Sequence, residues 1–238
     1  ASPRKEAVMS ITGFKTYLNN PFRYYFERVL DAKILEDRNA ELDDADYGTL
    51  VHDALKILCG ENAPAAPDSD AVDRAVERVF QRIEKTGNSG IPRIQKELIR
   101  GSLRSFARIQ AEESANGWSV ATVETPFDFP WNDLFSKYFP SESRAKWRDA
   151  VRIRGRIDRI DRHPTLGWRI LDYKTSKNAT APVKAHWAKR RKLDPQDEWK
   201  TVGEGTSTVW TDLQLPLYLA AFEAGLVRDA KPSRGERT

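Results

Sequence analysis

The chain has 238 residues, of which 31% are charged, and its formal net charge is +4. This length suits one domain with insertions, and no apolar run approaches the roughly 18 residues that a membrane span needs. The single cysteine, Cys59, excludes an internal disulfide, a zinc site built from several cysteines and an iron–sulfur cluster held within one chain. The positive charge permits a nucleic-acid partner, but Lys and Arg are spread along the sequence, so local clustering has to decide.

The first residues, ASPRKEAVMS, lack the apolar core of a secretory signal. We therefore expect a cytoplasmic protein. The same segment lacks an initiator Met, as an excised domain of a longer protein would.

Residues 10–30 predict two helical stretches that divide at Asn20 and Pro21, because Pro is tolerated at the first position of a helix. We expect the aromatic side chains of this segment to pack into the fold; they are Phe14, Tyr17, Phe22, Tyr25 and Phe26. After an acidic linker, YGTLVHDALKIL predicts a helix with an apolar stripe, and His52 lies beside that stripe.

Helix-period patterns at about 70–85 and 92–116 predict an inserted helical pair. From Trp118 the periodicity becomes that of strands, in SVATVETPFDF, VRIRGRID and WRILDYK, with RHPTLG as a turn between the last two. Residues 175–210 form a long basic connection with little apolar pattern. The segment TDLQLPLYLAAFEAG then predicts a final helix that ends at Gly225.

Three polar residues on the last two strands point to metal chemistry. Asp158 alternates with the aliphatic residues of its strand, and Asp172 and Lys174 are two residues apart and share a face. A hairpin centred near Thr165 would place Asp158 opposite Asp172, with Cβ atoms about 4.5–5.5 Å apart. Two carboxylates that close would bind one divalent cation such as Mg²⁺, and Lys174 would stabilise negative charge developing at phosphorus. This pattern predicts phosphodiester hydrolysis, although an Asp-x-Lys triplet alone is a weak signal.

Five motifs in chain order strengthen the signal: SITGFKTYLNNPFRYYF, GTLVHDAL, VETPF, GRIDRID with LDYKTS, and QLPLYLAA. With this order and spacing the chain resembles the RecB-like branch of the PD-(D/E)xK nuclease superfamily. We therefore expect an α/β fold with a central mixed β-sheet flanked by helices, in which residues 1–238 form a single domain with a helical insertion at about 70–116.

The resemblance also implies roles for individual residues. His52 and Asp158 correspond to metal ligands, Asp172 and Lys174 to the acidic residue and lysine of the DxK element, and the carbonyl of Tyr173 to a further ligand. The helix motif QxxxY, which lies beside the site in the family, is matched by Gln214 and Tyr218, and an acidic position on the first strand by Glu124. The expected cofactor is Mg²⁺ or Mn²⁺. Many relatives carry a cluster-binding cysteine where this chain has Asn20, so no iron–sulfur cluster is expected.

Three of these residues have simpler interpretations that the sequence leaves open. His52 could be a hydrogen-bonded histidine at a helix edge. Gln214 lies three residues after Thr211, a spacing that also fits a capping box at the helix start. Tyr218 could be a core aromatic one turn further on.

The segment HWAKRRKL is the strongest candidate for binding the DNA backbone. It contains Lys189, Arg190, Arg191 and Lys192, and Trp187 could stack on an unpaired base. Arg154, Arg156 and Arg159 flank Asp158 and are rival phosphate contacts. A solvated basic loop is the alternative.

We expect a metal-dependent DNA nuclease, by analogy an exonuclease of recombination or repair, with a helicase subunit or fused helicase domain as a partner. One alternative is a catalytically silent nuclease-like module that binds DNA within a helicase–nuclease complex. The intact Asp158, Asp172 and Lys174 argue against that alternative. A restriction-type endonuclease is a third interpretation, for which no target-recognition segment is evident.

Overall fold

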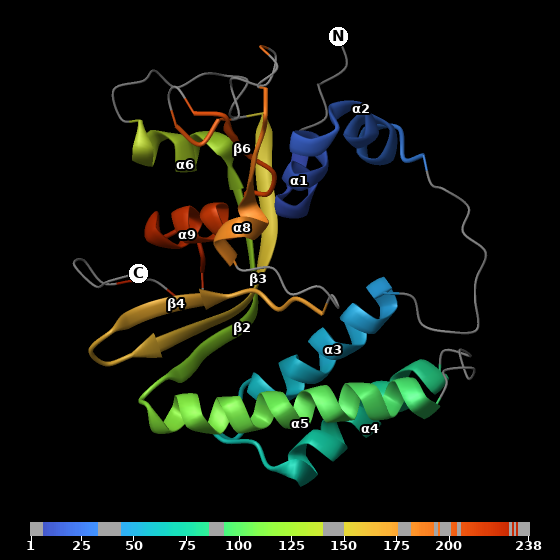
Figure 1. Cartoon of the computed structure of the whole chain (residues 1–238). Coiled ribbons are helices and arrows are strands. Elements are labelled where there is room, and N and C mark those ends of the chain that lie inside the picture. Colours follow the sequence, from blue (N-terminus) through green and yellow to red (C-terminus); the bar gives the residue numbers. More distant parts are fainter. Residues whose placement is uncertain are drawn as a thin grey trace. The chain divides into compact units, whose positions relative to one another are not determined.

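A computed structural model describes residues 7–32, 44–85, 93–139, 150–175, 182–192, 195, 201–203, 206–228, 230 and 232 (Figure 1). The chain forms two compact units. Unit 1 comprises Ala1–Leu35, Pro126–Arg156 and Asn178–Lys231, and unit 2 comprises Glu36–Thr125, Ile157–Lys177 and Pro232–Thr238. Among the described helices, none has both the length and the apolar character to cross a bilayer.

Two long strands contribute residues to both units. They are β2 (Ser119–Pro130) and β3 (Val151–His163), which are neighbours in one sheet of order β1-β3-β2. Strand β1 (Ala7–Ser10) runs parallel to the first residues of β3, and β4 (Gly167–Leu171) runs antiparallel to its last residues. The sheet is therefore mixed and accompanied by helices, which confirms the predicted fold class.

Unit 1 begins with the predicted pair of helices, α1 (Ile11–Asn19) and α2 (Pro21–Tyr24), followed by the π-helical turn η1 (Tyr25–Val29). The division falls at Asn20, whose extended backbone ends α1 and whose side chain accepts the Arg23 N–H at the start of α2. The division of residues 10–30 into two helices is thus confirmed.

The packing predicted for the aromatic residues of this segment is wrong in part. Phe22 is 79% exposed, and Tyr25 and Phe26 are about half exposed, at 49% and 54%. Phe14 does pack, with its ring centroid 6.0 Å from that of Trp131. A helix-period pattern identifies an apolar face but does not say whether another element covers it.

The other helices in the described part of unit 1 are α6 (Trp131–Tyr138), α8 (Pro182–His186) and α9 (Gln214–Glu223). Strands β5 (Trp187–Lys189) and β6 (Thr208–Trp210) form a two-stranded antiparallel sheet in what the sequence predicted to be an irregular connection. Three-residue strands are too short to show a periodicity. Helix α9 is followed by Gly225 at φ +70°, a conformation that favours glycine, so the predicted helix end is confirmed.

Gly155 explains how β3 packs closely within unit 1. A Cβ atom at this position would lie 2.4 Å from Phe127 Cζ and 2.7 Å from Ile11 Cγ1. The missing side chain therefore lets the strand backbone contact the buried Phe127 and Ile11 directly.

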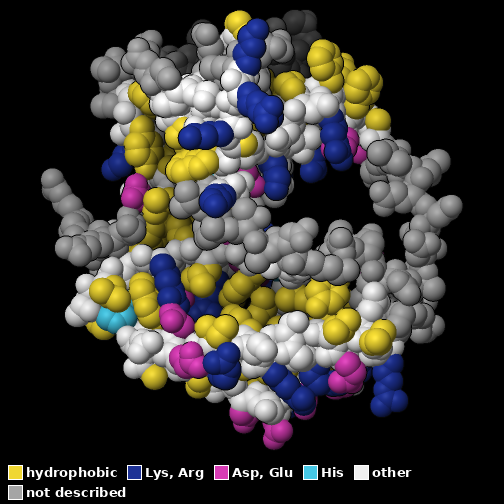
Figure 2. All heavy atoms as spheres, viewed as in Figure 1, with side chains coloured by type: hydrophobic (Ala, Val, Ile, Leu, Met, Phe, Trp, Pro, Cys, Tyr) yellow, Lys and Arg dark blue, Asp and Glu magenta, His cyan; other side chains and the backbone are white. Residues whose placement is uncertain are grey.

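Unit 2 is built on the helices α3 (Asp44–Cys59), α4 (Ser69–Lys85) and α5 (Arg93–Ala115). Their facing apolar residues form one core, to which α4 contributes Val72, Ala75, Val76 and Val79. The predicted helical pair at about 70–116 is confirmed in α4 and α5. On their outer face acidic and basic side chains alternate (Figure 2), and many of them form ion pairs, including Arg100 with Glu77 and Arg104 with Asp73.

Candidate metal centre

The β3–β4 hairpin of unit 2 has the predicted register. Arg159 pairs with Leu171 and His163 with Gly167, so the hairpin is centred at Thr165. Continuing this register by one residue places Asp158 opposite Asp172.

Helix α3 brings His52 to this hairpin through a close approach at Gly48, one turn earlier on the same face. A Cβ atom on Gly48 would lie 3.1 Å from the Thr175 hydroxyl oxygen, which is tighter than an ordinary contact. The glycine of GTLVHDAL therefore allows the segment after Lys174 to lie against the helix.

Three side chains from three separate segments converge in unit 2. The His52, Glu124 and Asp158 ligand atoms all lie within 4.8 Å of one another. His52 Nδ1 is 3.7 Å from Asp158 Oδ2 and 4.0 Å from Glu124 Oε1. We call these three residues the metal cluster.

The tautomer of His52 follows from its second nitrogen. Nε2 lies 3.2 Å from the carbonyl oxygen of Tyr173, which can only accept, so Nε2 carries a proton and donates it. In the neutral ring Nδ1 is then an acceptor directed at two carboxylates. Three acceptor groups with no donor among them repel unless a cation or a proton lies between them.

The pKa of Asp158 reflects this crowding. Burial raises it to about 6 from an ordinary value of 3.8, and the nearby carboxylates of Asp172 and Glu124 add to the effect. The N–H of Tyr173, which donates to Asp158 Oδ2 at 2.7 Å, and the His52 ring oppose it. The group binds a proton easily when no cation is present.

One nitrogen and two carboxylate oxygens suit a divalent cation of the Mg²⁺ or Mn²⁺ class. A bound cation would remove the repulsion among the three acceptors, so the residues present fit the metal that the sequence predicted. A carbonyl oxygen has two lone pairs, so the hydrogen bond from His52 is compatible with the predicted role of the Tyr173 carbonyl as a further ligand.

Asp172 and Lys174 lie outside the metal cluster and pair with each other. Lys174 Nζ is 2.5 Å from Asp172 Oδ2, and the Lys174 side chain is 61% exposed while that of Asp172 is 5% exposed. The predicted shared face is thus present. Asp172 is close enough to influence the pKa of Asp158, but in this structure Glu124 takes the third place in the cluster that we expected for Asp172.

Glu124 reaches the cluster through an unusual backbone conformation. Its φ is +52°, rare for a residue with a side chain, and the hydroxyls of Thr122 and Thr125 lie 2.7 Å apart across it. This positive φ within β2 interrupts the alternation of the strand, so spacing alone could not assign a direction to the Glu124 side chain. The only signal in the sequence was the VETPF motif.

The prediction that Arg159 contacts phosphate is contradicted by its burial. The side chain is 1% exposed and forms an ion pair with the buried Asp161. A signal was present in the sequence, because Arg159 is two residues from Ile157 and so falls on the aliphatic face of the strand. Arg154 forms an ion pair with Asp128, and Arg156 is exposed.

Gln214 and Tyr218 belong to unit 1, whereas the metal cluster belongs to unit 2. Both side chains are buried, and the Gln214 amide donates to the Tyr218 hydroxyl at 3.0 Å. The capping box that the sequence left open as an alternative for Gln214 is not formed, because the Asp212 carboxylate, and not Thr211, accepts the Gln214 N–H at 2.8 Å. Asp212 also pairs with Lys15 of α1, a link between distant segments that the sequence did not reveal.

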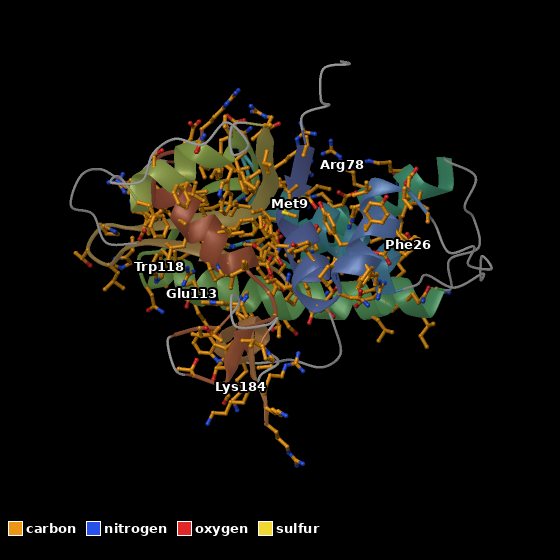
Figure 3. The ribbon with its side chains drawn as sticks, turned by 90° about the horizontal axis from the view of Figure 1, so that it is seen from above. Met9, Phe26, Arg78, Glu113, Trp118 and Lys184 are labelled. Carbon is orange, nitrogen blue, oxygen red and sulfur yellow. The ribbon has the colours of Figure 1, made fainter. Side chains whose placement is uncertain are left out.

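The basic segment of unit 1 is exposed, as both DNA binding and the alternative of a solvated basic loop require. Lys189, Arg190, Arg191 and Lys192 are all exposed, and so is Lys184, which is labelled in Figure 3. Trp187 is only partly exposed, since its ring packs edge-on against that of Trp210 at 5.6 Å. This contact orients the β5–β6 pair and leaves less of the ring for stacking on a base.

A cavity of about 970 Å³ lies between α3, α4, α5 and β2 within unit 2. Lys56, Arg78 and Arg82 are among the residues lining it, but none of the metal cluster is. The cluster is therefore a separate feature of this unit.

Comparison with known proteins agrees with this geometry. The family model described as the PD-(D/E)XK nuclease superfamily matches residues 8–237, which include both units and all three cluster residues. No curated protein sequence matches the chain at a significant level. The match over nearly the whole length, together with the metal cluster beside an Asp-x-Lys element, shows that the chain belongs to the PD-(D/E)XK nuclease superfamily and is a metal-dependent nuclease.

Proposed function

We propose that this nuclease hydrolyses DNA phosphodiester bonds as an exonuclease of the RecB-like branch, using Mg²⁺ or Mn²⁺. The observation that carries the proposal is the metal cluster, in which His52, Glu124 and Asp158 present three acceptor atoms within 4.8 Å of one another. The five sequence motifs support the RecB-like assignment.

The cluster residues would hold the cation, with the Tyr173 carbonyl and Asp172 as the further ligands expected from the family. When bound, a divalent cation polarises a phosphoryl oxygen and acidifies water, which is the chemistry that hydrolysis of a phosphodiester needs. The hydrogen bond from His52 Nε2 to the Tyr173 carbonyl fixes the ring so that Nδ1 keeps its lone pair toward the two carboxylates.

Lys174 supplies a positive charge beside the cluster. Asp172 holds the ammonium group at 2.5 Å, while most of the lysine side chain remains in solvent, where a phosphate group can reach it. An ammonium group placed there would stabilise negative charge that develops on the phosphoryl oxygens in the transition state.

The DNA backbone would be bound by exposed basic residues, for which Arg156, Lys189, Arg190, Arg191 and Lys192 are the candidates. The cations of α5 are not among these candidates, because they are largely paired with acidic residues of the same helical pair, as Lys96 is with Glu77. A cation that a nearby carboxylate already neutralises adds less to the release of counterions when phosphate binds.

Exonuclease action, a role in recombination or repair and a helicase partner are proposed by analogy with the family. The decisive experiment incubates labelled linear and circular DNA, each single- and double-stranded, with the purified protein in Mg²⁺, Mn²⁺ or EDTA. An Asp158→Asn variant purified in parallel reports any contaminating nuclease.

We expect metal-dependent degradation of linear DNA, protection of circles and no activity in EDTA. Cutting of circles would overturn exonuclease action but leave the nuclease assignment in place. If no DNA is degraded with either metal while DNA still binds, the silent-module alternative is favoured.

A further inference from the structure

The buried Arg159 connects three segments of unit 2. Its guanidinium donates two hydrogen bonds to Asp161, from Nε to Oδ1 at 2.5 Å and from Nη2 to Oδ2 at 2.9 Å. The remaining nitrogen, Nη1, lies 3.4 Å from the Tyr173 hydroxyl and 3.5 Å from Cys59 Sγ. One side chain of β3 therefore contacts the Asp-x-Lys segment and the last turn of α3.

Tyr173 is in turn the residue on which two members of the metal cluster depend. Its N–H donates to Asp158 Oδ2 at 2.7 Å, and its carbonyl accepts from His52 Nε2 at 3.2 Å. Its ring meets the His52 ring edge-on at 5.9 Å and the Phe106 ring at the same distance. The orientation of this one residue sets the direction of both ligands.

We propose that Arg159 is a positioning residue for the metal centre, acting through the side chain of Tyr173. Asp161 fixes the plane of the Arg159 guanidinium, and the guanidinium in turn holds the Tyr173 hydroxyl. With its side chain held, Tyr173 keeps its backbone carbonyl directed at His52 and its backbone N–H directed at Asp158. This inference rests on the proposed metal-binding role of those two residues. Replacing a group that orients a metal ligand commonly costs about 10–100-fold in metal affinity.

Arg169 provides a matched control within the same unit. Its Nη2 lies 2.9 Å from the same Asp161 oxygen that Arg159 binds, so its loss also breaks an ion pair to a buried carboxylate. The other contacts of Arg169 are with Glu113 and with the face of the Trp118 ring, at 4.1 Å; both partners are labelled in Figure 3. The side chain thus supports the fold without reaching Tyr173.

The experiment measures Mn²⁺ binding by calorimetry, without DNA, together with unfolding in denaturant. The proteins are the wild type, Arg159→Gln, Arg169→Gln, Tyr173→Phe and the double variant Arg159→Gln/Tyr173→Phe. We expect Arg159→Gln to weaken Mn²⁺ binding by about tenfold or more. We expect Arg169→Gln to lower stability with less than about a twofold change in affinity, because Arg159 retains both of its hydrogen bonds to Asp161 and its contact with the Tyr173 hydroxyl in this variant.

Tyr173→Phe removes only the hydroxyl and is expected to fold, so it keeps the proposal testable if Arg159→Gln does not. It should weaken Mn²⁺ binding, and the double variant should bind no more weakly than Arg159→Gln alone, because the two groups act through one contact. If the wild type binds Mn²⁺ and both Arg159→Gln and Tyr173→Phe bind it as tightly as the wild type does, Arg159 has only a structural role and the inference fails. If the wild type binds no Mn²⁺, the metal site of the proposed function fails instead.

Discussion

The raised pKa of Asp158 gives the metal-free protein a defined pH dependence. A carboxyl group whose pKa is raised on folding stabilises the fold below its unfolded pKa, and this stability is lost as pH rises through the folded pKa. For Asp158 the window runs from 3.8 to about 6. The side chain is only 12% exposed, so solvent screens the effect little, and the loss of stability across this window approaches about 3 kcal/mol.

We therefore predict that Asp158→Asn stabilises the metal-free protein at pH 7.5 but has little effect at pH 4. An amide accepts the Tyr173 N–H as the carboxylate does, without placing a charge in the cluster. Denaturant unfolding in EDTA at the two pH values tests this expectation. Equal pH dependence in wild type and variant would show that Asp158 does not carry the proton.

His52 is expected to be essential for metal binding and to favour Mn²⁺, because an imidazole nitrogen suits Mn²⁺ better than Mg²⁺. His52→Ala should lose most of the rate and the Mn²⁺ advantage. His163→Ala is the matched control, since His163 also contacts a backbone carbonyl, that of Asn116 at 2.9 Å, but on the hairpin away from the cluster residues. The measurement is the initial rate across a series of Mn²⁺ and Mg²⁺ concentrations. If His52→Ala keeps wild-type rates with both metals, His52 is a packing residue and not a metal ligand.

Strand β2 stores backbone strain at Glu124. A residue with a side chain at φ +52° costs about 1–2 kcal/mol relative to glycine in the same conformation. In EDTA we predict that Glu124→Gly is more stable than Glu124→Ala by about 1 kcal/mol, the reverse of the usual order within a strand. Both variants remove the carboxylate, so both should lose metal affinity. Denaturant unfolding decides the order, and an alanine variant as stable as the glycine variant would mean that the backbone at this position relaxes to a negative φ.

The basic segment of unit 1, Lys189 to Lys192, should contribute to DNA binding by neutralising phosphates. Arg190→Ala/Arg191→Ala is predicted to reduce the slope of log affinity against log salt by about 1.4–1.8, since each phosphate that an arginine neutralises adds about 0.7–0.9 to the slope. The control Arg104→Ala/Arg108→Ala removes the same charge, but both arginines already pair with acidic residues, Asp73 and Glu112. Equal slopes in the two double variants would place the phosphate-binding residues elsewhere.

The success of sequence-based prediction differed between elements for physical reasons. The β3–β4 register was predictable because a two-residue period and one turn fix a hairpin. The position of the Glu124 side chain in the metal cluster was not predictable, because a residue at positive φ breaks the two-residue period of a strand. The exposure of Phe22 was also not predictable, because an apolar helix face shows what can be buried and not what covers it. The burial of Arg159 was predictable in part. Its position in the strand placed it on the aliphatic face, but its charge favoured exposure to solvent.

At the scale of the whole molecule, the family match covers both units, whereas the metal cluster joins segments of unit 2 alone. His52, Glu124 and Asp158 are far apart in sequence, so a cation held by all three cross-links α3, β2 and β3. A ligand present at about a hundred times its dissociation constant stabilises the folded state by about 2.7 kcal/mol.

We predict that saturating Mn²⁺ slows amide hydrogen exchange most in unit 2, in α3, in the Ser119–Thr125 part of β2 and in the Ile157–His163 part of β3. Unit 2 has its own helical core, so its local opening is the process that the cation opposes. Helices α1 and α9 of unit 1 should change by a smaller factor. Hydrogen exchange followed by mass spectrometry, with Asp158→Asn as the metal-free control, measures the change in protection of each segment.

A uniform increase in protection would show that the two units open together. No increase in unit 2 would mean that His52, Glu124 and Asp158 do not share a cation.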